Sequence, residues 1–295
     1  MRIGITGASG MLGESLLKNL SKKHELFATS RSVGLEDKNI HWDCFDLTDI
    51  NLLKNWLHKI NPDVVIHCAA IIDIDLCEDN INLAKKLHIK TTEVLVNYSN
   101  NNKTRLIYIS TDSVFDGEKV GSYDESDTAN PINVYAKTKF LGEQLVESLD
   151  TGLILRVNIV GSTRKGKKSF SEWVLKNLFE GEPMNLFFDV YFSPLFVDDL
   201  SLIINKIIYN PLVGVYHCAS RDSISKYDFG KKMADIFKLS ASNINQISIC
   251  DVVFKANRPK NMALEVHKIS SALDINLPSV NDSIRSIKLK HDNNI

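Results

Sequence analysis

The sequence predicts an α/β protein built around a doubly wound parallel β-sheet, with a smaller lobe added by the C-terminal part of the chain. Two observations lead to this prediction. Short apolar segments alternate with amphipathic helical patterns through the first half of the sequence, and this alternation is typical of βαβ units. A glycine-rich turn also follows the first predicted strand and opens the first predicted helix.

Five strands are predicted in the first half of the chain, with helices between them. The strands are 2–6, 26–29, 63–68, 105–110 and 153–157. The helices are 11–20, about 49–60, about 75–100 and about 133–149. Asn61-Pro62 marks the end of the second helix, and Asn130-Pro131 marks the entry to the fourth.

The pattern becomes less regular after residue 160. It predicts two more strands, at 186–188 and 213–218, and helices near 169–180, 197–209 and 226–237. We expect residues 1–160 to form the main domain, with its sheet completed by parts of 186–218. Residues 161–295 are then expected to form mainly the smaller lobe, over the C-terminal edge of the sheet.

Composition narrows the classes of protein to be considered. Of the 295 residues, 44% are hydrophobic and 24% are charged, which is ordinary for a folded protein. The net charge of -1 argues against a nucleic-acid or membrane partner recruited by bulk electrostatics. No apolar run approaches the ~20 residues that span a bilayer, and the N-terminus lacks a signal-peptide pattern. The five cysteines include no Cys-x-x-Cys pair, so we expect a cytoplasmic protein with reduced thiols and no metal site.

The first predicted strand runs into Gly7-Ala-Ser-Gly-Met-Leu-Gly13, which opens the helix 11–20. Glycines let the backbone turn tightly and approach a pyrophosphate, whose charge then meets the helix N-terminus. The position at the first strand-to-helix turn favours a Rossmann-type dinucleotide site over an ordinary turn. The predicted cofactor contacts are Gly7, Ser9, Gly10, Met11, Leu12 and Gly13.

The residues at the end of the second strand indicate which dinucleotide is bound. NAD-binding proteins usually place a carboxylate here to accept from the ribose 2′-OH, whereas an arginine suits a 2′-phosphate. This chain has Ser30-Arg31 and no acidic residue. We therefore expect Ser30 and Arg31 to contact the 2′-phosphate of NADP(H), with NAD(H) as the less favoured cofactor. The alternative is a solvated loop arginine.

Further cofactor contacts are predicted after two other strands. Asp46, next to Leu47, is a candidate acceptor for the adenine amino group. An acid at the start of the helix 49–60 is explained equally well by the helix dipole, so both interpretations remain open. Ala69 and Ala70 follow the strand 63–68, and their small side chains would let a cofactor lie against the sheet edge.

A phenol and an ammonium lie four residues apart in Tyr135-Ala-Lys-Thr-Lys139, so both project from one helical face. A free tyrosine has a pKa of about 10, and a nearby lysine cation lowers it by stabilising the phenolate. Tyr135 is thus a candidate general acid that Lys139 tunes, and Lys139 can also hold the nicotinamide ribose. The position after the fifth strand favours this interpretation over an ordinary surface helix.

The third candidate group follows the strand 105–110. Ligands of open α/β sheets bind at the carboxyl edge of the strands. There the Thr111 hydroxyl is placed to donate to a substrate carbonyl and to support the oxyanion formed on reduction. Ser110 is the rival for this role, and a simple turn or cap made by these polar side chains is the structural alternative.

Together these segments resemble the extended short-chain dehydrogenase/reductase superfamily, and within it the dTDP-4-dehydrorhamnose reductase family of sugar-nucleotide reductases. The similarity covers nearly the whole chain. The glycine turn and the Tyr-x-x-x-Lys pattern are shared by the superfamily. More specific to the reductases are Ser110-Thr-Asp-Ser-Val-Phe-Asp-Gly117 and Arg258-Pro-Lys-Asn-Met-Ala-Leu-Glu265.

The resemblance implies a catalytic triad of Thr111, Tyr135 and Lys139. It also implies reduction of a 4-keto group on a nucleotide-linked deoxysugar, in the synthesis of surface polysaccharide precursors. The substrate would bind between the sheet edge and the C-terminal lobe, in contact with Thr111, Asp112 and Arg258. Arg258 is the best candidate for the diphosphate, and the basic loop 164–168 is a weaker one. Some relatives form dimers, so a homodimer is a candidate assembly.

Two departures from the family pattern concern the sugar pocket. The family often has tyrosine after Thr-Asp, where this chain has Ser113. The superfamily commonly has asparagine near His88, where it supports a proton relay. His88 would either replace that asparagine through a water or simply pack in the interface.

Two rival functions remain open. A sugar-nucleotide epimerase or dehydratase is disfavoured because Thr111-Asp112-Ser113 supplies one acid, where dehydratases of the superfamily usually have an acidic pair. The other rival is a non-catalytic NADP-binding regulatory subunit, since the beta subunit of methionine adenosyltransferase resembles the same family. The complete Tyr, Lys and Thr set disfavours that interpretation.

Overall fold

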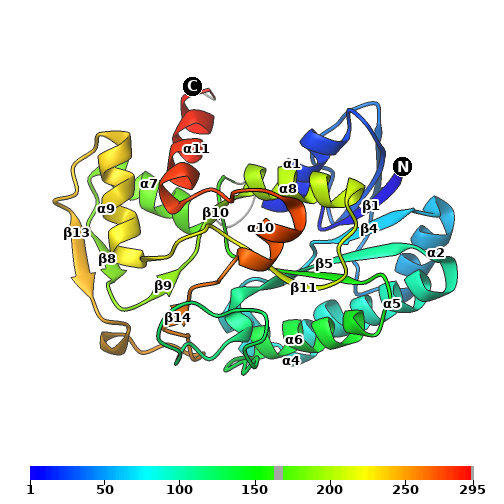
Figure 1. The fold of residues 1–295 in the computed structure, drawn as a ribbon, viewed down its shortest axis with the longest axis horizontal. Coiled ribbons are helices and arrows are strands. Elements are labelled where there is room, and N and C mark those ends of the chain that lie inside the picture. The colour runs from blue at the N-terminus through cyan, green and yellow to red at the C-terminus, as the bar shows by residue number, and fades with distance from the viewer. Residues whose placement is uncertain (163–168, 294–295) are drawn as a thin grey trace.

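The structure, a computed structural model, describes residues 1–162 and 169–293. A parallel sheet forms its centre (Figure 1). Its strands are β1 (Arg2–Thr6), β2 (Glu25–Ser30), β3 (Ile40–Cys44), β4 (Val64–His67), β5 (Arg105–Thr111), β6 (Leu153–Val157) and β11 (Gly214–Cys218). They run in the order β11-β6-β5-β4-β1-β2-β3, so the chain winds in both directions from β1. The predicted doubly wound parallel sheet is confirmed.

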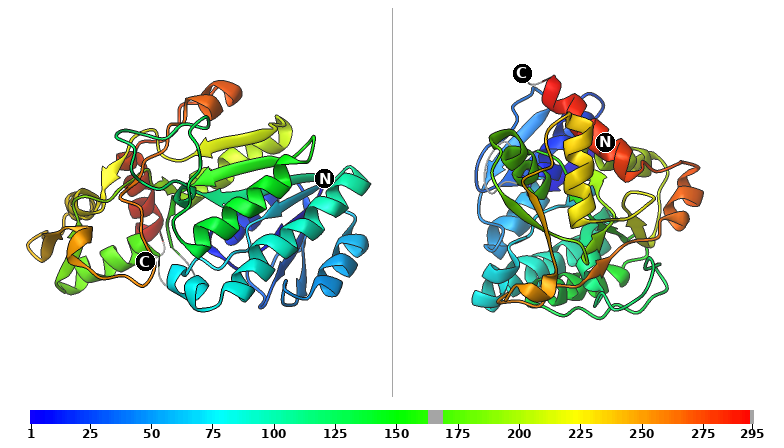
Figure 2. Two further views of the ribbon diagram at one scale, coloured as in Figure 1. Left: turned by 90° about the horizontal axis from the view of Figure 1, so that it is seen from below. Right: turned by 90° about the vertical axis from the view of Figure 1, so that its left-hand side faces the viewer.

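Helices cover both faces of the sheet (Figure 2). On one face lie α1 (Met11–Leu20) and α8 (Val197–Tyr209), and on the other lie α2 (Ile50–Ile60), α5 (Thr91–Asn102) and α6 (Val134–Glu147). Successive strand residues therefore enter two different cores. Ile107 and Ile109 of β5 join the core on the α1 side, while Leu106 and Tyr108 join the core on the α6 side. Burial on both faces is expected of a parallel sheet.

The continuous helix predicted over 75–100 is wrong. The segment forms α3 (Ile74–Asp79), α4 (Ile81–Lys85), a π-helical turn (Lys86–Lys90) and then α5. The break lies at Asn80, whose side-chain oxygen accepts a hydrogen bond from Leu83 N at 3.0 Å and so begins a new helix. Periodicity alone does not reveal such an internal cap.

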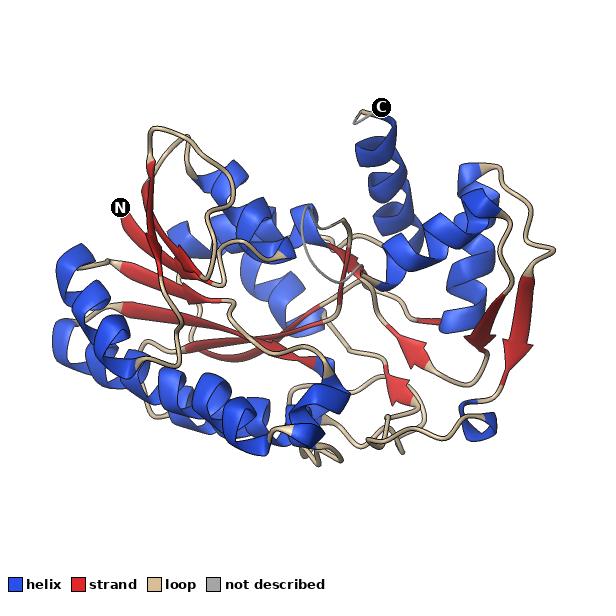
Figure 3. Cartoon of the chain, turned by 180° about the vertical axis from the view of Figure 1, so that it is seen from behind, coloured by secondary structure: helices blue, strands red, loops and turns tan. Residues whose placement is uncertain are grey.

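The described part of the C-terminal lobe includes the helices α7 (Phe170–Glu180), α9 (Lys226–Phe237) and α11 (Val280–Asp292). Short strands lie between these helices (Figure 3). Strand β9 (Tyr191–Phe192) lies between β12 (Ile224–Ser225) and β14 (Asn261–Met262). Strand β7 (Ile159–Val160) pairs with β10 (Leu195–Phe196), and α10 (His267–Leu273) packs against β11.

The second-half strands divide between the two parts of the molecule. The strand predicted at 213–218 joins the main sheet as β11, next to β6. The strand predicted at 186–188 forms part of β8 (Met184–Phe187), which pairs with β13 (Ile244–Ile247) outside the main sheet. Leu186 of β8 packs so closely on α9 that a side chain at Gly230 would collide with it.

Helix α6 lies unusually close to β5. The Asn133 side chain caps its first turn by accepting from Ala136 N at 2.9 Å. A Cβ at Gly142 would lie 2.3 Å from the Tyr108 hydroxyl oxygen, so only glycine permits this approach. The close packing fixes the helix that carries Tyr135 and Lys139 over the end of β5.

Candidate active site

The turn between β1 and α1 depends on its glycines. Gly7 has φ +65°, and a Cβ there would lie 2.8 Å from the Ala69 backbone, at the end of β4. A Cβ at Gly13 would lie 2.5 Å from the carbonyl oxygen of Gly7. The turn is therefore a tight cradle in which two positions have no room for a side chain.

The N-terminus of α1 is open to an anion. Gly10 caps the helix without a side-chain hydrogen bond, so within the described ranges 1–162 and 169–293 the first-turn amides, including those of Leu12 and Gly13, have no capping side chain as acceptor. Ser9 is half-buried at the same turn, and Met11 is half-buried while Leu12 is buried. The cradle and the uncapped helix fit the pyrophosphate of a dinucleotide, which needs close backbone approach and free N–H groups.

The predicted 2′-phosphate contacts, Ser30 and Arg31, lie at the carboxyl end of β2, and the predicted adenine contact, Asp46, follows β3. Arg31 is exposed, and its guanidinium helps to lower the pKa of Asp46 from its usual value. The main cause of that lowered pKa is the hydrogen bonding of Asp46 to Thr48, whose backbone amide donates at 2.8 Å. Asp49 caps α2 by accepting from Asn51 N and Leu52 N, so Asp46 lies three residues before the cap. Ser30 is buried and its hydroxyl donates to the carbonyl of Ser32.

The small residues after β4 lie beside the glycine cradle. Ala69 is buried and contacts Gly7, whereas Ala70 is half-buried. Leu47 is buried in the core that also contains Ala69. Small and apolar side chains thus line the edge of the sheet between β1 and β4.

The three predicted catalytic residues come together at the end of β5. Thr111 is the last residue of β5 and Tyr135 lies in the first turn of α6, close enough for the Thr111 side chain to act on the pKa of Tyr135. Lys139 lies one turn further along α6, where its Nζ donates to the carbonyl of Ile109 at 2.7 Å. The same Nζ lies 3.9 Å from the centroid of the Tyr108 ring.

Burial controls the charge of this cluster. It lowers the pKa of Lys139 from 10.5 to about 7, although Glu143 acts in the opposite direction. The lowered pKa expected for Tyr135 beside Lys139 is wrong for the protein by itself, because burial raises the pKa of Tyr135 above its usual value and the Thr111 side chain offsets this only in part. In the protein by itself Tyr135 is therefore a protonated phenol, as a proton donor must be.

A buried ion pair between α6 and β6 lies next to the cluster. Glu143 is fully buried, and the Arg156 guanidinium on β6 donates to both of its carboxylate oxygens, at 2.7 to 3.1 Å. Ser110 donates to the same carboxylate. The Ser110 hydroxyl therefore belongs to the buried Glu143–Arg156 network, whereas the Thr111 hydroxyl donates to Asp112 at 3.1 Å.

His88 packs against Tyr135 at the π-helical turn. The two rings meet edge to face, with centroids 5.9 Å apart. Both ring nitrogens have partners, since Nε2 accepts from Ile71 N at 2.9 Å and Nδ1 lies 2.7 Å from the Thr138 hydroxyl. Burial lowers the pKa of His88 to about 3, so the ring is neutral near pH 7. This geometry favours a packing role over a proton relay.

Asp112 lies beside Thr111 with its carboxylate buried. It accepts from the hydroxyls of Thr111 at 3.1 Å and Ser113 at 3.2 Å, and from the Asn158 amide. Burial nevertheless raises its pKa, and the nearby Lys226 cation acts in the opposite direction. Neither Asn158 nor Lys226 was a predicted site residue, because no local motif connects them to Asp112.

An ion pair with a residue of α3 positions the Arg258 side chain. Its Nη2 donates to Asp75 Oδ1 on α3 at 2.9 Å. Its Nε is buried and has no hydrogen-bond partner among the described residues. The other predicted diphosphate contact, the loop 164–168, lies outside the described residues.

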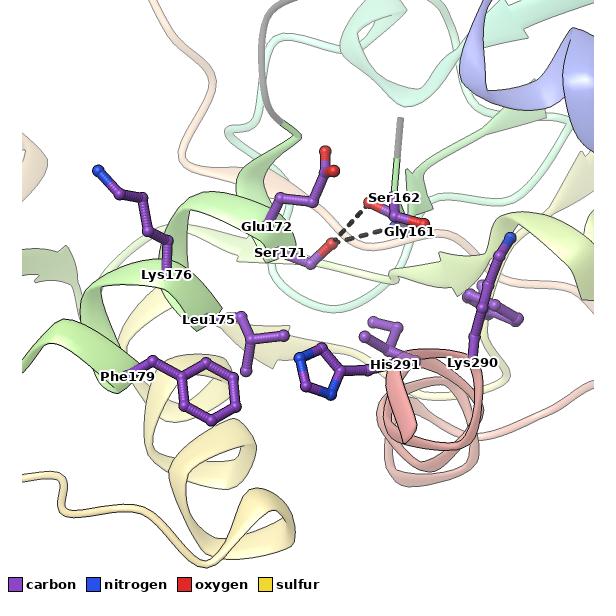
Figure 4. Close-up of a pocket in the computed structure, with 11 residues that line it drawn as sticks. Gly161, Ser162, Ser171, Glu172, Leu175, Lys176, Phe179, Lys290 and His291 are labelled. Carbon is purple, nitrogen blue, oxygen red and sulfur yellow. Dashed lines mark hydrogen bonds between the residues drawn. The ribbon is translucent and has the colours of Figure 1, made fainter. Parts of the chain in front are cut away.

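A separate hollow lies between α7 and α11 (Figure 4). Its described lining combines apolar groups such as Phe179 and Leu175 with polar groups such as Lys290 and His291. None of these described lining residues belongs to the predicted catalytic or cofactor set. The hollow is therefore distinct from the cluster around Tyr135.

Comparison with known proteins agrees with this geometry. The profile of one family, described as RmlD substrate binding domain, matches residues 1–291. The chain belongs to this family. A probable low-salt glycan biosynthesis reductase of Haloferax volcanii is 28% identical over 292 residues, which cover 96% of this chain and 96% of that protein. Methionine adenosyltransferase 2 subunit beta of Xenopus laevis is 30% identical and covers 90% of this chain and 80% of that protein.

A solved relative extends the match to three dimensions. The crystal structure of dTDP-4-dehydrorhamnose reductase from Bacillus anthracis in complex with NADP has a TM-score of 0.84 and 27% identity. The match covers 98% of this chain and 99% of that one. The predicted membership of the extended short-chain dehydrogenase/reductases, on the RmlD branch, is thereby confirmed.

Two further observations bear on what this RmlD-family chain can bind. Among residues 1–162 and 169–293, no group of three or more His, Cys, Asp or Glu side chains is arranged to hold a metal ion. No helix in the described part is long and apolar enough to cross a membrane.

The lowered pKa of Lys139 predicts a pH dependence of stability. The unfolded chain keeps the ordinary pKa of 10.5, so between pH 7 and 10.5 it binds more protons than the folded protein. Stability therefore rises with pH over this interval. Lys139→Met removes this contribution, and its stability should rise less steeply than that of the wild type in denaturant unfolding at pH 7 to 10.

Lys137→Met is the matched control, since Lys137 is exposed on the same helix. It should keep the wild-type slope. Equal slopes for Lys139→Met and the wild type would contradict the burial of an amine with a lowered pKa.

Proposed function

We propose that this chain is an NADPH-dependent reductase of the 4-keto group of a nucleotide-linked deoxysugar, similar to dTDP-4-dehydrorhamnose reductase. The observation that carries the proposal is the cluster of Thr111, Tyr135 and Lys139 at the carboxyl end of β5. Only β4 separates β5 from β1, the strand that leads into the glycine cradle. Family membership and the Haloferax and Bacillus reductases support it. We infer that the product enters the synthesis of surface polysaccharide.

The cofactor site we propose combines the residues of the glycine cradle with the ends of two neighbouring strands. When bound, NADPH supplies the reducing equivalent. The first-turn amides of α1 hold its pyrophosphate, Ser30 and Arg31 hold the 2′-phosphate, and Asp46 accepts from the adenine amino group. Leu47, Ala69 and Ala70 line the apolar edge of the sheet.

We propose three distinct roles for the catalytic residues. Thr111 donates a hydrogen bond to the carbonyl oxygen and orients it. Tyr135 donates its phenolic proton to the oxygen as negative charge develops there. Lys139, in its protonated form, stabilises the phenolate left on Tyr135 and holds the nicotinamide ribose. Asp112 and Arg258 contact the substrate, Arg258 through its diphosphate.

The main rival is a regulatory subunit, which the similarity to the Xenopus protein favours. The presence of all three catalytic groups supports the enzyme instead. An epimerase or dehydratase is less well supported, because Asp112 is the one acidic side chain of the Thr111–Ser113 segment. A cytoplasmic location and a homodimer also remain proposals.

Tyr135→Phe tests the proposed proton donor. Loss of the hydroxyl should lower kcat for dTDP-4-dehydrorhamnose about 10²- to 10⁴-fold, the usual contribution of a general acid. The Kd for NADPH should change less than about twofold, since α6 keeps its packing. Tyr209→Phe, at an exposed tyrosine, is the control. Full turnover by Tyr135→Phe would refute the mechanism.

Arg31→Ala tests the proposed 2′-phosphate contact. Loss of a charge-assisted hydrogen bond of about 1.5–3 kcal/mol should lower the preference for NADPH over NADH roughly tenfold or more in kcat/KM. Lys38→Ala, an exposed cation in the same β2–β3 loop, should leave the preference unchanged. An unchanged preference in Arg31→Ala would identify Arg31 as a solvated loop residue.

A further inference from the structure

The catalytic segment after β5 faces the small sheet of the C-terminal lobe. Ser113 Oγ lies 3.8 Å from the sulfur of Met262, on β14. In this sheet β14 and β12 flank β9 on its two sides, and Lys226 directly follows β12 as the first residue of α9. Lys226 thus approaches the catalytic segment from the lobe and not from the Rossmann sheet.

The Lys226 ammonium is held by aromatic rings. Its Nζ lies 3.5 Å from the centroid of the Phe192 ring and 4.2 Å from that of Phe170, and these two rings pack edge to face. Within the described part of the chain, Nζ has no hydrogen-bond or ion-pair partner. The rings therefore position the ammonium by cation–π contact and leave its N–H donors free.

Lys226 in the C-terminal lobe and Asp112 in the catalytic segment after β5 carry opposite charges. The cation acts to lower the pKa of Asp112, and the carboxylate acts to raise that of Lys226, although burial brings Lys226 to about 8. They form no direct ion pair in the described structure, and Asp112 is held by Thr111, Ser113 and Asn158. A hydrogen-bond donor on the lobe, held by the Phe170 and Phe192 rings, and a buried acceptor beside the catalytic threonine thus lie on segments that meet at the Ser113–Met262 contact.

The chemistry of this pair selects its ligand. A hydroxyl group can accept from an ammonium and donate to a carboxylate at the same time. A diphosphate cannot donate, and the buried Asp112 carboxylate would repel it. The pair therefore suits a sugar hydroxyl close to the carbonyl that Thr111 orients.

We propose that Lys226 is a specificity-determining residue that binds the sugar ring, with its ammonium donating to a hydroxyl that in turn donates to Asp112. This inference rests on the proposed reductase function, because it names the part of that substrate which the C-terminal lobe recognises. It gives the lobe a defined contact at the reactive end of the substrate.

Lys226→Met tests the assignment by kinetics. Methionine keeps apolar bulk between the two rings but removes the N–H donors. KM for dTDP-4-dehydrorhamnose should rise at least about tenfold, the lower limit for a hydrogen bond from a charged group, while KM for NADPH stays within about twofold. Lys231→Met, at an exposed lysine of α9, should change neither value. A lower Tm with an unchanged KM for the sugar nucleotide would show a merely structural lysine.

A second measurement does not depend on turnover. Reductive ¹³C-methylation labels the lysines for NMR, and the Lys226→Met variant identifies the Lys226 resonance. With NADP⁺ present, dTDP-4-dehydrorhamnose should shift this resonance, whereas dTDP alone should not. A shift with dTDP alone, or no shift with either ligand, would overturn the contact with the sugar ring.

These experiments distinguish failure of the proposed reductase function from failure of the Lys226 assignment. If the wild type binds the sugar nucleotide and shifts the Lys226 resonance without oxidising NADPH, the reductase function fails and the sugar contact stands. If the wild type reduces the substrate while Lys226→Met keeps its KM and the resonance does not move, the Lys226 assignment alone is overturned.

Discussion

The burial of the Lys139 amine is the constraint on which the rest of the site depends. Its Nζ is fixed between the Ile109 carbonyl and the face of the Tyr108 ring, so α6 must lie tightly against β5. Gly142 permits that approach, and the Glu143–Arg156 pair fastens the next turn of α6 to β6. Since a buried amine with a pKa of about 7 is easily neutralised, anionic groups bound nearby would favour its charged form.

The two halves of the chain contribute different chemistry to one place. The Rossmann sheet supplies the glycine cradle and the catalytic residues, because the carboxyl ends of β1, β4 and β5 are neighbours. The lobe supplies Lys226 with its aromatic rings, and Arg258, which is tied to Asp75 on α3. On our proposals the reaction is carried out by the first group and the substrate is selected by the second.

Features encoded by local sequence could be predicted well. Three such features are the glycine turn, the spacing of Tyr135 and Lys139, and the polar segment after β5. Each depends on residues that are close together in sequence, so the sheet and the central residues of the candidate site could be predicted from them. The break at Asn80 and the place of β8 could not be predicted, because they depend on a side-chain cap and on pairing with β13, which is distant in sequence. Lys226 meets Asp112 only through tertiary structure, and no periodicity or motif marks it.

The most direct test of the central claim is the fate of deuterium from the reactive face of [4-²H]NADPH. With dTDP-4-dehydrorhamnose, the account predicts one deuterium at C4 of the sugar for each NADP⁺ formed, measured by mass spectrometry and NMR of the product. A sugar nucleotide converted without net NADPH oxidation, or a protein that binds NADPH and transfers no deuterium, would contradict it.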